Sequence, residues 1–222
     1  MNKVLSSRWT KPFLFLLCLV PLLLLGWRYK HDELGANPIE YITHKTGDWT
    51  IRFLLITLSI TPFRKLLNQP KLARLRRMLG LFAFFYGCLH LMTWAWLDKF
   101  FDVQEMWKDV VKRRFITVGM TGFVLMIPLA ITSAAGWVRR LGFVRWQRLH
   151  RLVYFSALAG VIHYYWLVKS DIRLPLLYGT LVGLLLLYRI VAASLARKKT
   201  PAPKRAAQAG GDARPQGSAS LP

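Results

Sequence analysis

The stretches RMLGLFAFFYGCLHLMTWAWL at residues 77–97 and LHRLVYFSALAGVIHYYWLV at residues 149–168 each carry one histidine deep inside an apolar run. Each run has about 20 residues, the length that an α-helix needs to cross the roughly 30 Å hydrocarbon core of a bilayer. An ionisable side chain at that depth is costly in lipid and is usually functional. These stretches predict a membrane protein whose function involves His90 and His163.

Further apolar runs, at residues 12–28, 49–67, 115–136 and 173–195, extend the pattern. The fold expected is therefore an all-α membrane protein, a bundle of about six transmembrane helices. The first run could instead be a secretory signal, because Lys3, Arg8 and Lys11 precede it. We favour a retained helix, since no small-x-small cleavage site follows the run and Trp27-Arg28-Tyr29 is typical of an interfacial anchor.

The distribution of charge predicts the orientation. The N-terminus, residues 64–77, residues 139–151 and the tail after Ala196 carry 3, 6, 5 and 6 Lys and Arg, with Asp212 as their one acidic residue. All other acidic residues fall in the opposite loops. By the positive-inside rule both termini, residues 1–11 and 197–222, are expected in the cytoplasm. The basic tail 197–222 is also expected to be disordered.

The same distribution excludes other classes of protein. A net charge of +22 would suit nucleic-acid binding, but the basic residues lie in short blocks between apolar runs. Cys18 and Cys88 both fall inside predicted spans, so an exported disulfide is excluded. The positive charge therefore reflects membrane topology.

His90 and His163 have matching sequence surroundings. Each lies 13 residues after the inner boundary residue of its span, which is Arg77 or His150, and so roughly 20 Å along a helix of 1.5 Å rise per residue. A glycine precedes each histidine by one turn, Gly87 or Gly160, on the surface that a flat macrocycle bound to the imidazole would cover. The pattern favours a haem held between the two histidines, although an interhelical hydrogen bond and a metal-transport site remain alternatives.

Two imidazole ligands would leave no open position on the iron, which favours electron transfer over substrate chemistry. His150, in the segment WQRLHR at the inner boundary, would need a facing histidine near residues 76–77 to hold a second haem, and arginines stand there. It could bind the same cofactor system differently, contact a flavin or quinone, or cap a helix. His31 and His44 lie in a predicted outer loop and are expected to be solvated.

Several polar segments between the spans carry a resemblance to a known family. They are Asn37–Glu40 with Gly47-Asp48-Trp49, Thr57–Arg64, Arg76–Leu81 leading through Tyr86 to His90, Lys112–Gly119, Pro128–Ser133 and Trp146–Tyr154 before His163. Over most of residues 8–195 the chain resembles the ferric-reductase-like transmembrane family. The resemblance implies that residues 12–196 form a haem-binding transmembrane domain in a bacterial inner membrane.

The resemblance also implies cofactors and a partner. It implies a b-type haem, a bound FMN, and delivery of electrons to a periplasmic molybdopterin-containing subunit that reduces methionine sulfoxide in oxidised proteins. The family's histidines correspond to His90, His150 and His163. The larger oxidase and ferric-reductase relatives have a second histidine on the third span and a cytosolic flavin and nicotinamide domain, and this chain has neither. The catalytic site is expected on the partner.

A haem toward the outer leaflet leaves much of the membrane to cross, so a second carrier is expected near the inner face. FMN fits there, because the arginines of 74–77 and 139–151 could bind its phosphate, although the positive-inside rule alone accounts for them. The donor could be the quinone pool or a cytoplasmic flavin reductase. Arg52 is a candidate partner for a haem propionate, and residues 29–48 or 98–109 could dock the catalytic subunit. A stand-alone ferric reductase and, less favoured, a transporter are the competing functions.

Overall fold

The computed structural model of the chain describes residues 7–168 and 170–199, and these residues form helices and no strands. The predicted all-α class is thereby confirmed. In chain order the elements are α2 (Thr10–Lys30), α3 (Pro38–Leu66), the 3₁₀ turn η1 (Pro70–Leu72), α4 (Ala73–Met92), the π-helical turn η2 (Thr93–Asp98), α5 (Val103–Lys112), α6 (Arg114–Ile131), α7 (Ala135–Leu141), α8 (Phe143–Leu149), α9 (Leu152–Leu167) and α10 (Arg173–Lys199). Most of the predicted basic tail, from residue 200, lies outside the described residues.

Four helical segments of the described chain are long and apolar enough to cross a membrane: Thr10–Lys30, Pro70–Asp98, Arg114–Ile131 and Arg173–Leu195. They coincide with four of the predicted spans. The other two predicted spans correspond to α3 and α9, which differ in length and polarity. Helix α9 has 16 residues and so extends about 24 Å, and α3 carries buried Asp48 together with Arg52.

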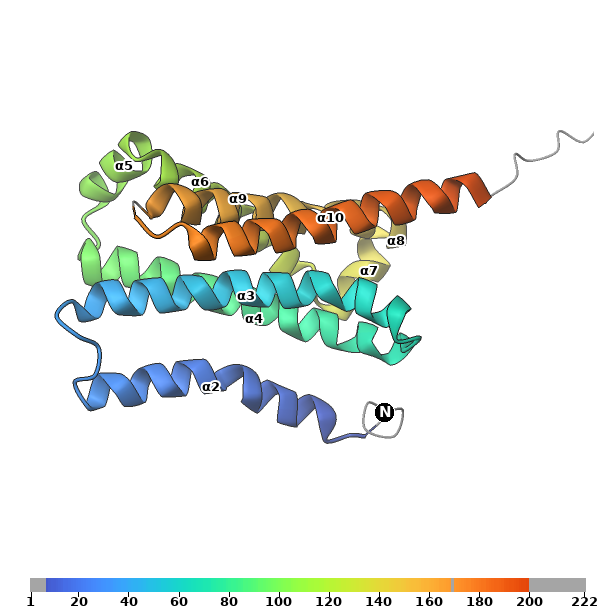
Figure 1. Cartoon of the computed structure of the whole chain (residues 1–222), viewed down its shortest axis with the longest axis horizontal. Helices are drawn as coiled ribbons and strands as arrows, with labels where there is room; N and C mark the ends of the chain where they lie inside the picture. The colour runs from blue at the N-terminus through green and yellow to red at the C-terminus, as the bar shows by residue number, and fades with distance from the viewer. Residues whose placement is uncertain (1–6, 169, 200–222) are drawn as a thin grey trace, which may run out of the picture. The chain divides into compact units, whose positions relative to one another are not determined.

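The chain divides into two compact units, residues 1–188 and 189–222. In the second unit, residues 189–199 are the last turns of α10. In the first unit, α3 lies alongside α4 and α6 lies alongside α9 (Figure 1). Helix α3 is the element common to both apolar cores.

One core lies between α2, α3 and α4, where Phe53 stacks on Phe82 and Tyr86. The Tyr86 hydroxyl is buried there and donates a hydrogen bond of 2.9 Å to the carbonyl of Cys18. The other core joins α3 and α9 to the first half of α10 through residues such as Leu58 and Val182. Because α3 is covered on both sides, it tolerates polar residues that a lipid-facing helix would not.

Helices α6 and α9 approach closely at a glycine. The buried Ser156 hydroxyl of α9 donates a hydrogen bond of 2.8 Å to the carbonyl of Gly122 on α6. A Cβ atom at Gly122 would lie 3.2 Å from the Cβ of Ala159 and 3.5 Å from the carbonyl oxygen of Ser156. Small residues at such crossings allow the backbones of membrane helices to pack and to form interhelical hydrogen bonds.

The substitution Gly122→Leu is expected to destabilise the α6–α9 pair, because the new side chain has no space between the two backbones. Overpacking of this kind costs about 1–3 kcal/mol, which should appear as a lower midpoint of thermal unfolding of the purified protein in detergent. The matched control is Gly183→Leu on α10, where an added Cβ meets nothing within 4 Å. An equal loss of stability in both variants would contradict this account of the crossing.

Candidate functional site

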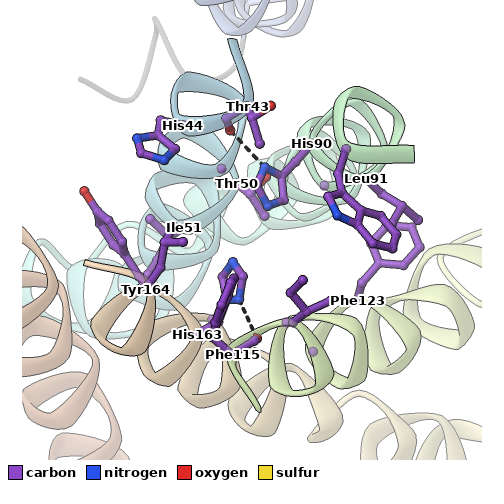
Figure 2. Close-up of a pocket in the computed structure, with 18 of the residues that line it drawn as sticks. Thr43, His44, Thr50, Ile51, His90, Leu91, Phe115, Phe123, His163 and Tyr164 are labelled. Carbon is purple, nitrogen blue, oxygen red and sulfur yellow. Dashed lines mark hydrogen bonds between the residues drawn. The ribbon is translucent and has the colours of Figure 1, made fainter. Parts of the chain in front are cut away.

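The structure brings His90 of α4 and His163 of α9 to opposite sides of one cavity. Figure 2 shows the two imidazoles facing each other across it. Their ring centres are 6.0 Å apart and their planes are inclined at 75°. The two side chains are 73 positions apart in sequence, so the packing of the helices creates this pair.

Each imidazole is held by a main-chain carbonyl from another helix, α3 for His90 and α6 for His163. Nδ1 of His90 donates to the carbonyl of Thr43 on α3 at 2.9 Å, and Nδ1 of His163 donates to the carbonyl of Phe115 on α6 at 2.7 Å (Figure 2). A carbonyl oxygen can only accept, so Nδ1 carries the proton in both rings. The lone pair of each neutral ring is therefore on Nε2, which is the arrangement found when a histidine binds a metal.

Glycines account for how close the rings come to these carbonyls. Gly47 follows Thr43 by one helical turn, and Gly119 follows Phe115 by one helical turn. A Cβ at Gly47 would lie 3.1 Å from the ring of His90, and a Cβ at Gly119 would lie 2.6 Å from Nδ1 of His163. Each glycine thus leaves open the side of the helix from which the imidazole reaches the carbonyl.

Gly47 and Gly119 were not identified as site residues from the sequence, which drew attention instead to the glycines on the histidine helices. Of those, Gly160 borders open space in the cavity, and a Cβ at Gly87 would lie 3.4 Å from the ring of Phe123. In the sequence, Gly47 and Gly119 are marked only by standing one helical turn after Thr43 and Phe115. That spacing indicates a site only when it is known which histidine faces each helix.

The spacing of the two rings fits a single ion between them. Metal–imidazole bonds are about 2 Å long and a ring centre lies about 1 Å behind its nitrogen, so two imidazoles on opposite sides of one ion have centres about 6 Å apart. The observed 6.0 Å agrees with this distance. The cavity has a volume of about 510 Å³, within the range of pockets that hold cofactors.

The polarity of the cavity wall changes along its length. Asn37, Glu40, Asp98 and Arg113 line the end near the start of α3 and the end of η2. Deeper in, the wall is formed by apolar residues such as Phe123. An amphipathic ligand with charged groups at one edge would place that edge at the polar end.

Two residues near this cavity differ from expectation. His44 is exposed, as expected, but it lies on α3 and not in a loop, and it lines the cavity (Figure 2). Arg52 was a candidate partner for a haem propionate, with a position at the membrane interface as the alternative. In the structure its Nε donates to the hydroxyl of Tyr178 at 2.9 Å and its guanidinium lies 3.8 Å from Asp48. Of this pair, Asp48 is the residue that lines the cavity.

His150 belongs to a second cavity of about 590 Å³ and does not join His90 and His163. It lies between α8 and α9, where its Nε2 is 3.0 Å from the hydroxyl of Thr132 and its ring stacks on Trp146 at 4.0 Å. The Thr132 hydroxyl donates to the carbonyl of Pro128 at 2.6 Å, so Nε2 of His150 donates to the hydroxyl oxygen. In a neutral ring, Nδ1 is then the atom that can accept a hydrogen bond or bind a ligand.

The wall of the second cavity is more basic than that of the first. Three arginines line it: Arg76, Arg77 and Arg151. The hydroxyl of Thr57, also in the wall, is buried and has no hydrogen-bond partner among the described residues. A buried polar atom without a partner costs free energy, so this hydroxyl is consistent with a ligand in the cavity.

The sequence of this chain matches a known protein family. Residues 46–161, from Thr46 near the start of α3 to the last turns of α9, match the family described as ferric reductase like transmembrane component. That range contains His90 and His150 and ends two residues before His163. No solved structure matches the chain.

Several curated proteins match over most of the chain, and all carry the name protein-methionine-sulfoxide reductase heme-binding subunit MsrQ. The protein of Herminiimonas arsenicoxydans is 57% identical over 194 residues, 86% of this chain and 89% of the relative. Those of Caulobacter vibrioides and Rhodospirillum rubrum are each 51% identical, over 79% and 85% of this chain and 84% and 91% of their own lengths. The chain therefore belongs to the ferric-reductase-like transmembrane family and, within it, to the MsrQ proteins.

Proposed function

We propose that this chain is a transmembrane b-type cytochrome that passes electrons to a methionine sulfoxide reductase subunit. The observation that carries the proposal is the facing pair His90 and His163, with 6.0 Å between ring centres and Nε2 of each ring as the available ligand atom. The names of the relatives, heme-binding subunits of a protein-methionine-sulfoxide reductase, supply the cofactor and the system.

The residues of the first cavity suit a haem. His90 and His163 would hold the iron from the two faces, and the wall between them is mainly apolar, as a porphyrin requires. When bound, a haem would supply one-electron transfer chemistry at this site. The protein fixes the ligand rings through the carbonyls of Thr43 and Phe115, and this raises the basicity of the ligand nitrogens.

The membrane arrangement proposed is six spans with both termini in the cytoplasm of a bacterium, in its inner membrane. To the four long apolar segments it adds α3 and α9, which pack against α4 and α6. Neighbouring helices shield their polar groups from lipid, so they need fewer apolar residues than an isolated span. The polar end of the first cavity then faces the periplasm, toward the partner.

The inner half of the path is assigned to the second cavity. We place FMN there as the carrier between the haem and the donor, which is the quinone pool or a cytoplasmic flavin reductase. Arginines Arg76, Arg77 and Arg151 offer forked hydrogen bonds to a phosphate, and Trp146 and His150 offer flat surfaces beside it. His150 serves as a contact of this inner cofactor rather than as a ligand of the outer haem.

The partner proposed is a periplasmic molybdopterin-containing subunit, which carries out the reduction of methionine sulfoxide in oxidised proteins. This chain forms the electron-transfer subunit of that oxidoreductase complex and has no catalytic residue of its own for the sulfoxide. Electrons leave through the polar end of the first cavity, where Asn37, Glu40 and Asp98 lie at the protein surface.

The variants His90→Ala and His163→Ala are each expected to abolish the outer haem, because a single remaining imidazole cannot hold the iron from both faces. The measurement is the reduced-minus-oxidised absorbance spectrum of the purified protein with its haem content per chain. The control is His31→Ala, since the ring of His31 contacts Trp27 and does not line the cavity. A wild-type protein without a Soret band, or normal haem in His90→Ala with loss in His150→Ala, would refute the assignment.

Gly119→Ala is expected to weaken haem binding although it leaves both ligands in place. The added Cβ would lie 2.6 Å from Nδ1 of His163 and displace the ring from the Phe115 carbonyl. Loss of such a supporting hydrogen bond typically costs about 10-fold or more in affinity, which haem transfer to apomyoglobin would measure. In the control Gly80→Ala the new Cβ makes ordinary contact, 3.6 Å from Thr57. Equal transfer rates in both variants would contradict the role of Gly119.

Substitution of both Arg76 and Arg151 by glutamine is expected to weaken FMN binding about 10-fold or more, because charge-assisted hydrogen bonds to a phosphate are lost. Titration of the purified protein with FMN, followed by flavin fluorescence, measures the dissociation constant. Arg139→Gln is the control, since this exposed arginine has the same charge and does not line the second cavity. Unchanged affinity in the double variant would exclude this site for the flavin.

A further inference from the structure

Helix α5, between η2 and α6, exposes more apolar side chains than a helix in water normally does. A surface helix of a soluble protein turns its apolar side chains inward and its charged side chains outward. In α5 the side chains of Met106, Asp109 and Val110 are half-buried, whereas those of Val103, Trp107 and Val111 are exposed. The exposed apolar side chains indicate what surrounds the helix.

The inward side carries an ion-pair cluster. Asp109 of α5 is 14% exposed and lies 2.8 Å from the Nζ of Lys99, which is 13% exposed, and 3.2 Å from Nε of Arg113. Asp98 and Glu105 approach Lys99 more loosely, each at 3.8 Å. The hydrogen bond to Asp109 raises the pKa of Lys99, so its ammonium stays charged. The central pair, Lys99 and Asp109, is thus covered by the protein, whereas Asp98, Glu105 and Arg113 at its edge are 51%, 57% and 55% exposed.

The outward side is an apolar stripe. Val103, Trp107 and Val111 follow one another at intervals of four residues, on one face of the helix, and are 75%, 69% and 62% exposed. Phe100, directly before the helix, is 80% exposed. No described residue of the chain covers these four side chains, which form the α5 stripe.

The backbone before α5 is strained at two phenylalanines whose side chains are exposed. Phe100 and Phe101 both have left-handed backbone angles, with φ of 47° and 58°. Non-glycine residues rarely adopt this region, and bulky ones least of all. The turn is closed by a hydrogen bond of 2.8 Å from Phe101 N–H to the carbonyl of Ala95, yet both rings remain exposed. The strain is compatible with rings that contact something outside the chain.

Contacts fix the level of α5 along the bundle. The hydroxyl of Thr117, one turn inside α6, donates to the carbonyl of Val110. Lys99, which holds Asp109, directly follows the end of η2. Helix α5 therefore folds back beside the ends of two apolar helices instead of projecting away from them. Met92 at the end of α4 and Trp96 in η2, which precede α5 in the chain, are also exposed apolar side chains.

We infer that α5 is an in-plane membrane helix whose stripe lies in the lipid interface, in the outer leaflet under the orientation proposed above. The occupant is the bilayer rather than a partner protein, because the segment from Asp98 to Arg113 has equal numbers of acidic and basic residues and offers no net charge to steer a partner. Amphipathic helices with Trp, Phe and Lys bind the headgroup boundary in this way. The inference does not depend on haem binding.

The bound helix has a consequence for the site. Arg113 ends the ion-pair cluster and lines the first cavity, and Phe115 two residues later holds His163 through its carbonyl. Anchoring α5 in lipid fixes the start of α6 and with it this carbonyl. It also assigns residues 98–109 to the membrane surface and leaves residues 29–48 as the docking region for the catalytic subunit.

A cysteine scan of the full chain tests the inference. In a Cys18→Ala, Cys88→Ala background, single cysteines at 103, 107 and 111 and at 104, 108 and 112 are labelled with an environment-sensitive fluorophore in phosphatidylcholine–phosphatidylglycerol vesicles. Labels at 103, 107 and 111 are expected to be quenched by nitroxide lipids and those at 104, 108 and 112 by aqueous iodide. Iodide quenching of all six labels, or protection of the stripe only after the purified catalytic subunit is added, would overturn it.

A second measurement keeps both native cysteines, in case the background variant fails to fold. Tryptophan fluorescence of the wild type and of Trp107→Phe is compared in vesicles with and without brominated lipids. Trp107 is expected to account for a measurable share of the bromine-sensitive emission, so the fraction quenched falls in the variant. Removal of a tryptophan that lies in water raises the quenched fraction, so a fraction that is unchanged or higher in the variant would reject the lipid contact.

Discussion

The pair of hydrogen bonds from the histidine Nδ1 atoms to main-chain carbonyls is the constraint on which the site depends. Each requires a helix carbonyl that can accept a second bond, and a side chain at the next turn would block the approach. Gly47 and Gly119 remove that obstacle. The same contact sets the packing of α3 against α4 and of α6 against α9, so ligand orientation and helix arrangement are one feature of the fold.

The polarity of α3 follows from its place between two apolar cores. A lone helix with Asp48 and Arg52 would be expensive in lipid, but here Tyr178 on α10 accepts a hydrogen bond from Arg52 and Asp48 lies beside the guanidinium. Helix α3 also gives the Thr43 carbonyl to His90. Residues that weaken it as an isolated span are thus the ones that connect it to its neighbours and to the cavity.

At the end of the bundle near the first cavity, Lys99 and Asp109 form an ion pair that the protein covers, and Val103, Trp107 and Val111 of α5 are exposed. In water this arrangement would expose a large apolar patch and bury charge without gain. At a membrane surface, exposed apolar side chains and a covered ion pair are both favourable, because lipid is the apolar phase there.

The helical membrane fold could be predicted from the sequence alone, because span length and rise per residue are local properties of a helix. The sequence also predicted a common depth for His90 and His163 and arginines near His150. The structure was needed to show that His150 lines a separate cavity, that Arg52 bonds Tyr178, and that Gly47 and Gly119 make room for the two imidazoles. Those outcomes depend on which helices are neighbours, and the bonds concerned join residues 47 and 48 positions apart, beyond the reach of any local pattern.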